Sequence, residues 1–207
     1  MEVTDSSSVS PTSAALKKRR REMIPAASRV FRRKRFGVMV MKRILLTGLS
    51  GTGKSTIIAE LAARGYNAID ADSPEYSEWL ELPHDSDEFG SLVEGNRDWV
   101  WREDRIQAIL ATEDAGVLFL SGCAQNMRKF LPQFDHIILL SAPAAVIVAR
   151  LATRTSNTYG KRPEEIARVL GQIETVEPLL RRIANYEIDT SVSLSDVVET
   201  VLRLTRV

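Results

Sequence analysis

Residues 43–56 read RILLTGLSGTGKST, and this stretch decides the fold of the chain. The pattern G-x-x-x-x-G-K-[ST] runs from Gly48 to Ser55 and is typical of a loop that wraps nucleotide phosphates. The apolar residues before the loop suit a buried strand, and residues 57–62 (IIAELA) suit an amphipathic helix. Because strand, glycine loop and helix follow one another as this pattern requires, the sequence predicts a nucleotide-binding domain.

Each part of this loop has a physical role in holding phosphate. Glycines let successive backbone N–H groups converge on an anion, and the start of the following helix adds its positive dipole end. Lys54 carries a charge that can reach the β- and γ-phosphates, and the Ser55 hydroxyl is placed to bind Mg²⁺. We therefore expect ATP and Mg²⁺ as cofactors. The residues predicted to hold the nucleotide are Gly48, Ser50, Gly51, Thr52, Gly53, Lys54, Ser55 and Thr56.

The composition is typical of a soluble globular domain. The chain has 207 residues, of which 44% are hydrophobic and 27% charged, enough for one domain with its own core. No apolar stretch approaches the roughly 20 residues that a membrane-spanning helix needs, so we expect no membrane partner. The only cysteine, Cys123, excludes an internal disulfide and fits a reducing compartment, which favours a cytoplasmic location.

Basic residues are concentrated at the N-terminus. Residues 1–40 hold ten of the 28 Lys and Arg residues and three of the 27 acidic ones, which leaves 41–207 with a net charge of about −6. Because 1–40 also lack apolar periodicity, we expect a disordered basic extension followed by a folded domain at 41–207. The extension could direct the chain to an organelle, contact nucleic acid, or be a dispensable leader. Nucleic acid is expected as a partner only through this extension.

Strand-like and helix-like segments alternate from residue 43 onward. After the first strand and helix, the expected elements are a strand at 66–70, a helix-compatible stretch at 74–110, strands at 117–120 and 136–140, helices at 144–153 and 163–184, a strand at 187–189 and a helix at 195–204. This alternation predicts an α/β fold with a five-stranded parallel sheet between two layers of helices. Ligands on such sheets gather at the carboxyl ends of the strands.

Polar side chains stand where two of these strands end. Asp70 and Asp72 follow the second strand, and Ser121 and Gly122 follow the third, so all should face the crevice that Lys54 enters. Two carboxylates spaced i, i+2 at a strand end point the same way, as a cation or polyol site needs. The alternative is that the two aspartates belong to a solvated turn before a proline.

Taken in order, the phosphate loop, IDAD at 69–72, WR at 101–102 and SG at 121–122 resemble the shikimate-kinase and adenylate-kinase-like group of P-loop small-molecule kinases, which includes the nucleoside monophosphate kinases. The resemblance spans about 42–205. It implies a three-layer α/β/α sandwich with strand order 2-3-1-4-5 and a small lid. By this resemblance Asp70 would lie near Mg²⁺, and Asp72 would bind a substrate hydroxyl and take part in catalysis.

The same resemblance assigns Arg102 and Gly122 to the acceptor. Shikimate kinases carry an aromatic-Arg pair about twenty residues before a glycine cluster, so Arg102 would hold an anionic substrate group, which its planar fork suits. Two departures argue against shikimate itself. Position 105 is Arg where that group has Glu, and the glycine cluster shrinks to Gly122. The extra arginine leaves open a more highly charged acceptor, such as a phosphate. The alternative for residues 99–105 is a helix with one packed aromatic face and one charged face.

Two arginines mark the expected lid. Arg150 and Arg154 lie four residues apart at the end of a helix, so they share a face, and a polar segment follows, giving a lid at about 154–163. By the resemblance, Arg150 packs near the nucleotide and Arg154 reaches the transferring phosphate as a catalytic residue. Phosphoryl transfer needs such cations because negative charge spreads over the equatorial oxygens. The alternative is a solvent-exposed basic helix end.

These observations predict an ATP-dependent phosphotransferase that passes the γ-phosphate to a small acceptor bearing a hydroxyl or a phosphate. The catalytic residues would be Lys54, Asp72, Arg150 and Arg154, with Arg102 and Gly122 at the acceptor and Ser55 and Asp70 at the metal. An NTP-binding ATPase or regulator without a small-molecule acceptor is the alternative. The identity of the acceptor and the oligomeric state are not encoded in these patterns.

Overall fold

The computed structural model describes residues 41–81, 97–113, 116–155 and 157–207. All of them belong to one compact unit, Val38–Val207. The predicted basic extension at 1–40 lies outside the described residues. Among the helices of the described part, none is long and apolar enough to cross a membrane.

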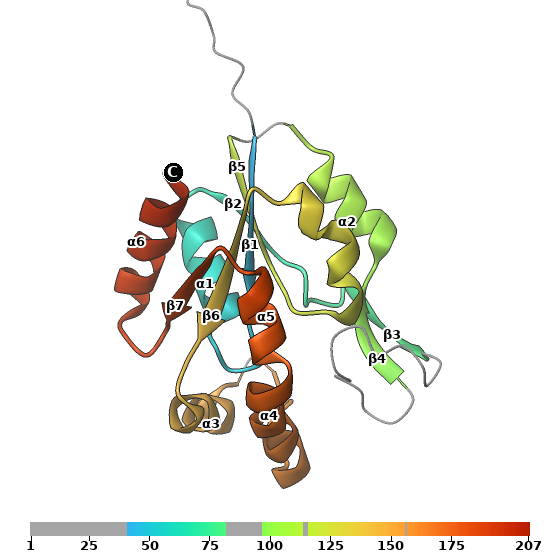
Figure 1. Cartoon of the computed structure of the whole chain (residues 1–207), viewed down its shortest axis with the longest axis vertical. Coiled ribbons are helices and arrows are strands. Elements are labelled where there is room, and N and C mark those ends of the chain that lie inside the picture. Colours follow the sequence, from blue (N-terminus) through green and yellow to red (C-terminus); the bar gives the residue numbers. More distant parts are fainter. Residues whose placement is uncertain (1–40, 82–96, 114–115, 156) are drawn as a thin grey trace, which may run out of the picture. The chain divides into compact units, whose positions relative to one another are not determined.

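A five-stranded parallel sheet forms the centre of the unit (Figure 1). Its strands are β1 (Lys42–Thr47), β2 (Asn67–Asp70), β5 (Val117–Ser121), β6 (His136–Ser141) and β7 (Tyr186–Asp189). Their order across the sheet is β2-β5-β1-β6-β7, and every neighbouring pair is parallel. Counted along the chain, these strands stand in the order 2-3-1-4-5, so the predicted topology is confirmed.

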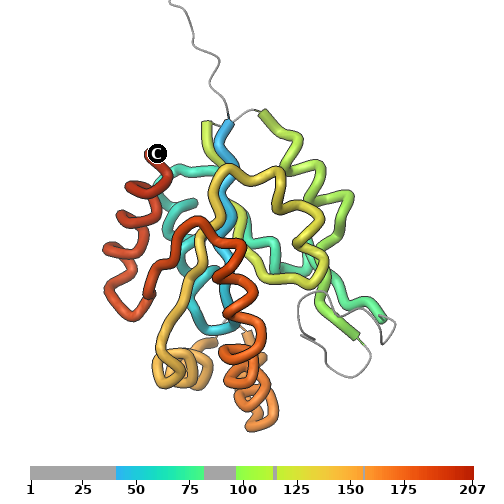
Figure 2. The backbone as a smooth tube through the Cα atoms, in the orientation of Figure 1, coloured from blue at the N-terminus to red at the C-terminus, as the bar shows by residue number. Residues whose placement is uncertain are grey.

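Helices cover both faces of the sheet. The elements are α1 (Lys54–Ala63), α2 (Glu103–Leu110), a 3₁₀ helix η2 (Gln125–Gln133), α3 (Ala144–Thr153), α4 (Pro163–Thr175), α5 (Glu177–Ile183) and α6 (Leu194–Thr205). Figures 1 and 2 show α1 and α6 on one side, α2 and α5 on the other, and α3 and α4 beyond the carboxyl end of β1. The three-layer α/β/α architecture is therefore confirmed.

The two faces of the sheet bury alternate residues of the same strands. In β1, Leu45 packs with the side chains of α2, η2 and α5, whereas Ile44 and Leu46 pack with those of α1 and α6. All three are fully buried, and β1 has a parallel neighbour on each side. A strand with both faces covered reads as a continuous apolar run, which is why the sequence before the loop is so uniformly hydrophobic.

Two expected elements are wrong in part. The stretch 74–110 is not one helical segment: Ser77–Glu81 (β3) and Arg97–Trp101 (β4) pair as an antiparallel two-stranded sheet, and among the described residues of this stretch only those of α2 are helical. The run RDWVW in β4 is rich in aromatic and β-branched residues, which favour strands. The predicted helix at 163–184 is divided at Val176, because Pro178 lacks an N–H and its ring clashes with the carbonyl of the preceding turn.

Candidate active site

The phosphate loop connects β1 to α1 and has the backbone form that its glycines permit. Gly53 precedes the first residue of α1 with φ 96° and ψ 9°, a left-handed conformation that side chains rarely adopt. Gly48 lies so close to β6 that a Cβ atom there would collide with the Leu140 carbonyl oxygen. The loop is therefore held against the sheet, with its end at the N-terminus of a helix, where anions bind.

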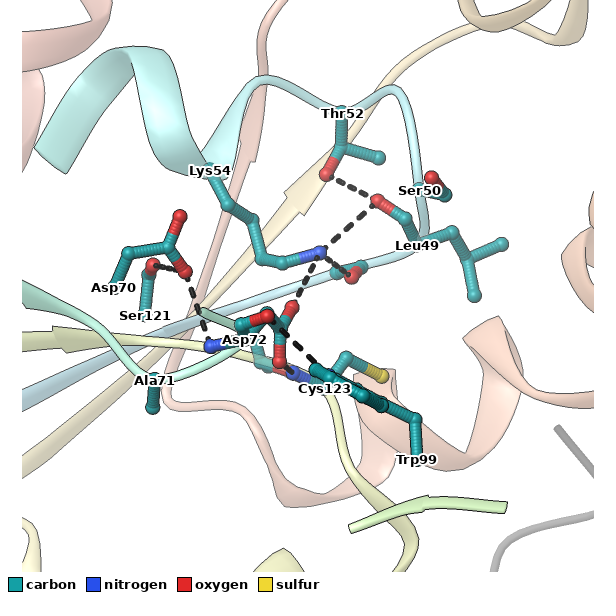
Figure 3. A network of polar contacts seen from close by, with 12 residues as sticks. Leu49, Ser50, Thr52, Lys54, Asp70, Ala71, Asp72, Trp99, Ser121 and Cys123 are labelled. Carbon is teal, nitrogen blue, oxygen red and sulfur yellow. Dashed lines mark hydrogen bonds and ion pairs between the residues drawn. The ribbon is translucent and has the colours of Figure 1, made fainter. Parts of the chain in front are cut away.

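Lys54 is the buried cation of this loop (Figure 3). Its Nζ donates to the carbonyl oxygens of Gly48 at 2.8 Å and Leu49 at 3.4 Å, and lies 3.4 Å from Oδ2 of Asp72. The ammonium thus bridges the loop and the end of β2. Thr52 braces the same turn, because its hydroxyl donates to the Leu49 carbonyl oxygen at 2.8 Å.

The structure brings Asp70 and Asp72 to the same edge of the sheet as Lys54 (Figure 3). Oδ1 of Asp70 accepts hydrogen bonds from the Ser121 hydroxyl and from the backbone N–H of Asp72, both at 3.1 Å. Oδ1 of Asp72 accepts the backbone N–H of Cys123 at 3.0 Å. In each carboxylate the Oδ1 atom accepts these hydrogen bonds, and in Asp72 the Oδ2 atom faces Lys54.

Ser55 and Asp70 fit a magnesium ion that is shared with phosphate. Ser55 is exposed at the start of α1, and both residues line the same cavity. The described residues contain no group of three or more His, Cys, Asp or Glu side chains that could enclose a metal by themselves. Mg²⁺ is typically held by one or two protein ligands, with phosphate oxygens and waters completing the octahedron, and this sparse donor set fits that mode.

The two arginines of α3 have different surroundings. The Arg150 guanidinium donates to two oxygens of Thr190, the backbone carbonyl oxygen and, at 2.9 Å, the hydroxyl oxygen. It also donates to the Gly51 carbonyl oxygen at 3.4 Å. Arg154 donates to the Ser50 hydroxyl at 3.3 Å and to the Tyr159 carbonyl oxygen. Its Nε is buried without a hydrogen-bond partner among the described residues, and burial lowers the pKa of the guanidinium. Arg154 also lines the cavity around the phosphate loop, so a phosphate bound there would lie near this charge.

A cavity of about 620 Å³ surrounds the phosphate loop. Residues 49–57, Asp70, Asp72, Arg150 and Arg154 line one part of it, and Thr190, Val192, Leu194 and Val197 line another. The first part is polar and charged, whereas the second is largely apolar and comes from the end of β7 and the start of α6. A polar end and an apolar end suit a ligand with phosphates at one end and a ring at the other.

A second cavity of about 690 Å³ adjoins the first. The two share six lining residues: Leu49, Ser50, Lys54, Asp72, Pro74 and Asn157. Beyond these, the second cavity is lined by Trp79 and Trp99 of the β3-β4 hairpin, by Cys123, by residues 155, 158 and 159 and by Glu165, Arg168 and Gln172 of α4. Lys54 and Asp72 therefore stand at the boundary between two binding spaces.

Arg102 and Gly122, the predicted acceptor residues, line neither cavity. Arg102 lies 3.5 Å from Glu78 of β3 in an ion pair. Gly122 has a packing role: a Cβ there would come within 2.7 Å of Trp101 and 2.8 Å of Oδ1 of Asp72. The absence of a side chain at Gly122 thus leaves room for the Asp72 carboxylate. Direct binding of an acceptor by Arg102 and Gly122 stays a prediction.

The Cys123 side chain lines the second cavity, but its thiol is not activated. Burial raises the pKa of the thiol to about 11, against a smaller opposing effect of the Lys54 charge. A thiol with that pKa stays protonated at neutral pH, so it is a poor nucleophile. The structure gives Cys123 a structural contact instead, through its backbone N–H to Asp72.

The segment between α3 and α4 is anchored at its far end by Glu165. The Glu165 carboxylate accepts the backbone N–H groups of Gly160, Lys161 and Arg162 at 2.7, 3.0 and 3.2 Å, and pairs with the Arg162 guanidinium. Burial alone would raise the pKa of Glu165, but these hydrogen bonds and the Arg162 charge lower it to about 2. The predicted lid therefore ends in a fixed turn.

Replacing Glu165 with glutamine is expected to loosen this turn, because the amide carries no charge and offers one acceptor oxygen. Hydrogen exchange at the Gly160 and Lys161 amides should speed up about tenfold at pH 7. The pKa of Glu165 is depressed in the folded state, so its contribution is complete above about pH 4.5 and is lost as the pH falls through about 2. The difference between variant and wild type should shrink over that interval. Glu164→Gln, whose side chain is 61% exposed, is the matched control and should leave these amides unchanged.

Sequence reasoning missed the contribution of α4 to the second cavity. Arg168 and Gln172 are spaced i, i+4 and share a helix face with Glu165, a pattern that is visible in the sequence. Unless the position of α4 is known, however, this spacing cannot be distinguished from that of an ordinary amphipathic helix.

This geometry defines a P-loop nucleotide-binding α/β fold with two adjoining cavities at the carboxyl edge of the sheet. A family model described as an AAA domain matches residues 44–171, and the chain belongs to this family. No curated protein sequence matches the chain.

Several solved small-molecule kinases have a similar fold. They include shikimate kinase from Acinetobacter baumannii in complex with shikimate (TM-score 0.53, 21% identity, 79% of this chain and 92% of that chain). A gluconokinase from Sinorhizobium meliloti has a TM-score of 0.50 at 21% identity, covering 80% of this chain and 94% of that one. Deoxyadenosine kinase from M. mycoides with bound dATP has a TM-score of 0.52 at 15% identity, covering 80% and 100%. The resemblance to P-loop small-molecule kinases is thereby confirmed for the fold.

Proposed function

We propose that the chain is an ATP- and Mg²⁺-dependent kinase that transfers the γ-phosphate of ATP to a small acceptor bearing a hydroxyl or a phosphate. The observation that carries this proposal is the pair of adjoining cavities with Lys54 and Asp72 at their boundary. A hydrolase needs room only for nucleotide and water, whereas here a second space of similar volume opens beside the loop. ATP would occupy the first cavity and the acceptor the second.

In the nucleotide cavity, the loop backbone and Lys54 would hold the phosphates, and Ser55 and Asp70 would hold Mg²⁺. The metal, when bound, neutralises charge on the β- and γ-phosphate oxygens. Arg154 would complete this set, since its guanidinium lines the nucleotide cavity and donates to the Ser50 hydroxyl of the loop. Arg150 would orient the loop relative to the ring end of the nucleotide, because it bonds both Gly51 and Thr190.

In the transfer step, an acceptor oxygen would attack the γ-phosphorus in line with the bridging oxygen of ADP. The new O–P bond forms as the β–γ bridge breaks, and the electron pair of the broken bond leaves with ADP. For a hydroxyl acceptor, Asp72 would receive the proton through Oδ2, the oxygen that faces Lys54. Lys54 and Arg154 stabilise the charge that builds up on the transferred group.

The direct test is a coupled measurement of ADP release and of acceptor phosphorylation over a panel of nucleoside monophosphates, sugar acids and polyols. One or more members should raise ADP release well above the rate with ATP alone, with one phosphorylated product per ADP. ADP release that no acceptor accelerates would instead support the alternative, a P-loop ATPase or regulator without a small-molecule acceptor. Removing residues 1–40 should leave the kinase activity intact.

A further inference from the structure

The second cavity has an aromatic wall that is fixed in position. Trp79 of β3 and Trp99 of β4 are directly opposite each other across the antiparallel pair, with ring centroids 5.2 Å apart and planes at 62°. Trp99 is anchored to the catalytic edge, because its indole N–H donates to the backbone carbonyl oxygen of Asp72 at 3.3 Å. Trp79 is 46% exposed. Arg97 lies over this indole with its Cζ 6.0 Å from the ring centroid, and Trp79 also lines the cavity, where its remaining exposed surface offers an aromatic ligand a place to pack.

Among the described residues, helix α4 gives the second cavity an unpaired positive charge. Four charged side chains line this cavity: Lys54, Asp72, Glu165 and Arg168. Lys54 pairs with Asp72, and Glu165 is engaged by the lid turn and Arg162. Arg168, which is half-buried, has no ion-pair or hydrogen-bond partner for its side chain among the described residues. The one uncompensated charge that lines the described cavity is therefore positive, and Gln172 adds an uncharged polar group one turn away.

From these observations we infer the chemical class of the acceptor: a planar aromatic ring that stacks on the Trp79–Trp99 wall, with an anionic group at Arg168 and the phosphate-accepting oxygen at Asp72. This inference rests on the proposed kinase function for the last of these contacts only. The 62° angle between the indoles forms a corner, in which a ligand ring that lies flat on one indole meets the other along its edge. Two sources share this chemistry, a hydroxylated aromatic carboxylic acid and a nucleoside monophosphate.

Calorimetric binding to the full chain tests the inference without requiring turnover. The aromatic probes are 3,4-dihydroxybenzoate and adenosine monophosphate, and the non-aromatic probes are shikimate and gluconate, all titrated with a non-hydrolysable ATP analogue present. At least one aromatic probe should bind more tightly than both non-aromatic ones. Trp99→Leu should weaken that binding between about 5-fold and 100-fold, as loss of one stacking contact does. Arg168→Gln should weaken it about tenfold or more.

Matched variants separate these contacts from damage to the fold. Trp79→Phe keeps an aromatic ring and should retain most of the affinity that Trp79→Leu loses. Arg203→Gln, at an exposed position of α6 that lines neither cavity, should change nothing. The two sources are told apart by which aromatic probe binds.

Two outcomes overturn different parts of the argument. Tighter binding of shikimate or gluconate, or affinity for the aromatic probes that survives both Trp99→Leu and Arg168→Gln, would refute the acceptor class while leaving a kinase intact. Aromatic binding that depends on both residues, without phosphate transfer to any bound probe, would uphold the site and count against the proposed kinase function instead.

Discussion

Lys54→Ala is expected to lower the turnover number for phosphate transfer by about 10²- to 10³-fold, the usual loss when one preorganised charge at the transferring group is removed. The ammonium is held by the carbonyl oxygens of Gly48 and Leu49 and by the Asp72 carboxylate, contacts that alanine cannot make. ATP affinity should fall as well, because in the proposed site the ammonium would also contact the bound phosphates in the ground state. Calorimetry with an ATP analogue and steady-state rates measure the two effects separately.

Lys129→Ala is the matched control for this prediction. Lys129 is an exposed lysine of η2 that pairs with Glu103 and lines neither cavity, so its removal should leave both measurements unchanged. Thermal unfolding curves should confirm that both variants remain folded. Unaltered ATP affinity and turnover in Lys54→Ala would falsify the assignment of the phosphate site.

Asp72→Asn should produce a different pattern: a turnover number reduced by about 10²- to 10⁴-fold with nearly unchanged ATP affinity. Asparagine has the same shape and can still accept the Cys123 N–H, but its amide cannot take up the proton of an acceptor hydroxyl. The loss should therefore appear in the chemical step and not in nucleotide binding. Single-turnover rates, together with calorimetry, measure this division.

Asp104→Asn, at an exposed position in the first turn of α2, provides the matched control and should behave as wild type. A second comparison tests the acceptor. If the acceptor is a phosphate that is already ionised, no proton needs to be removed, and Asp72→Asn should then cost far less. Full activity of Asp72→Asn toward a hydroxyl acceptor would exclude Asp72 as the base.

The sequence predicted the parts of the molecule whose pattern is local. The phosphate loop, the buried strands beside it and helix α3 at 144–153 follow from short-range spacing, and the structure confirms these elements. Asp70, Asp72 and Ser121 were also expected together, because carboxyl ends of neighbouring parallel strands meet at one edge. Their catalytic roles stay predictions.

The rest depends on contacts between distant segments, which one sequence does not encode locally. The β3-β4 hairpin was expected to be helical, since its strands are short and the polar stretch between them gives no clear signal. Arg102 shows the consequence. Its spacing matched a substrate-binding arginine, yet it lies beside Glu78 outside both cavities, whereas Arg168, whose spacing is that of any amphipathic helix, lines the second one.

The hairpin has a consequence for how the second cavity can change over evolution. Among the described strands, its two strands pair only with each other and are not part of the main sheet. At its inner end Trp101 is fully buried, while Trp79 and Trp99 stand further out. The outer half of the hairpin can therefore change in sequence while its buried inner half keeps the hairpin attached to the rest of the fold. A change at Trp79 would alter the second cavity without touching the phosphate loop, whereas a change at Trp99 would also remove a contact to Asp72.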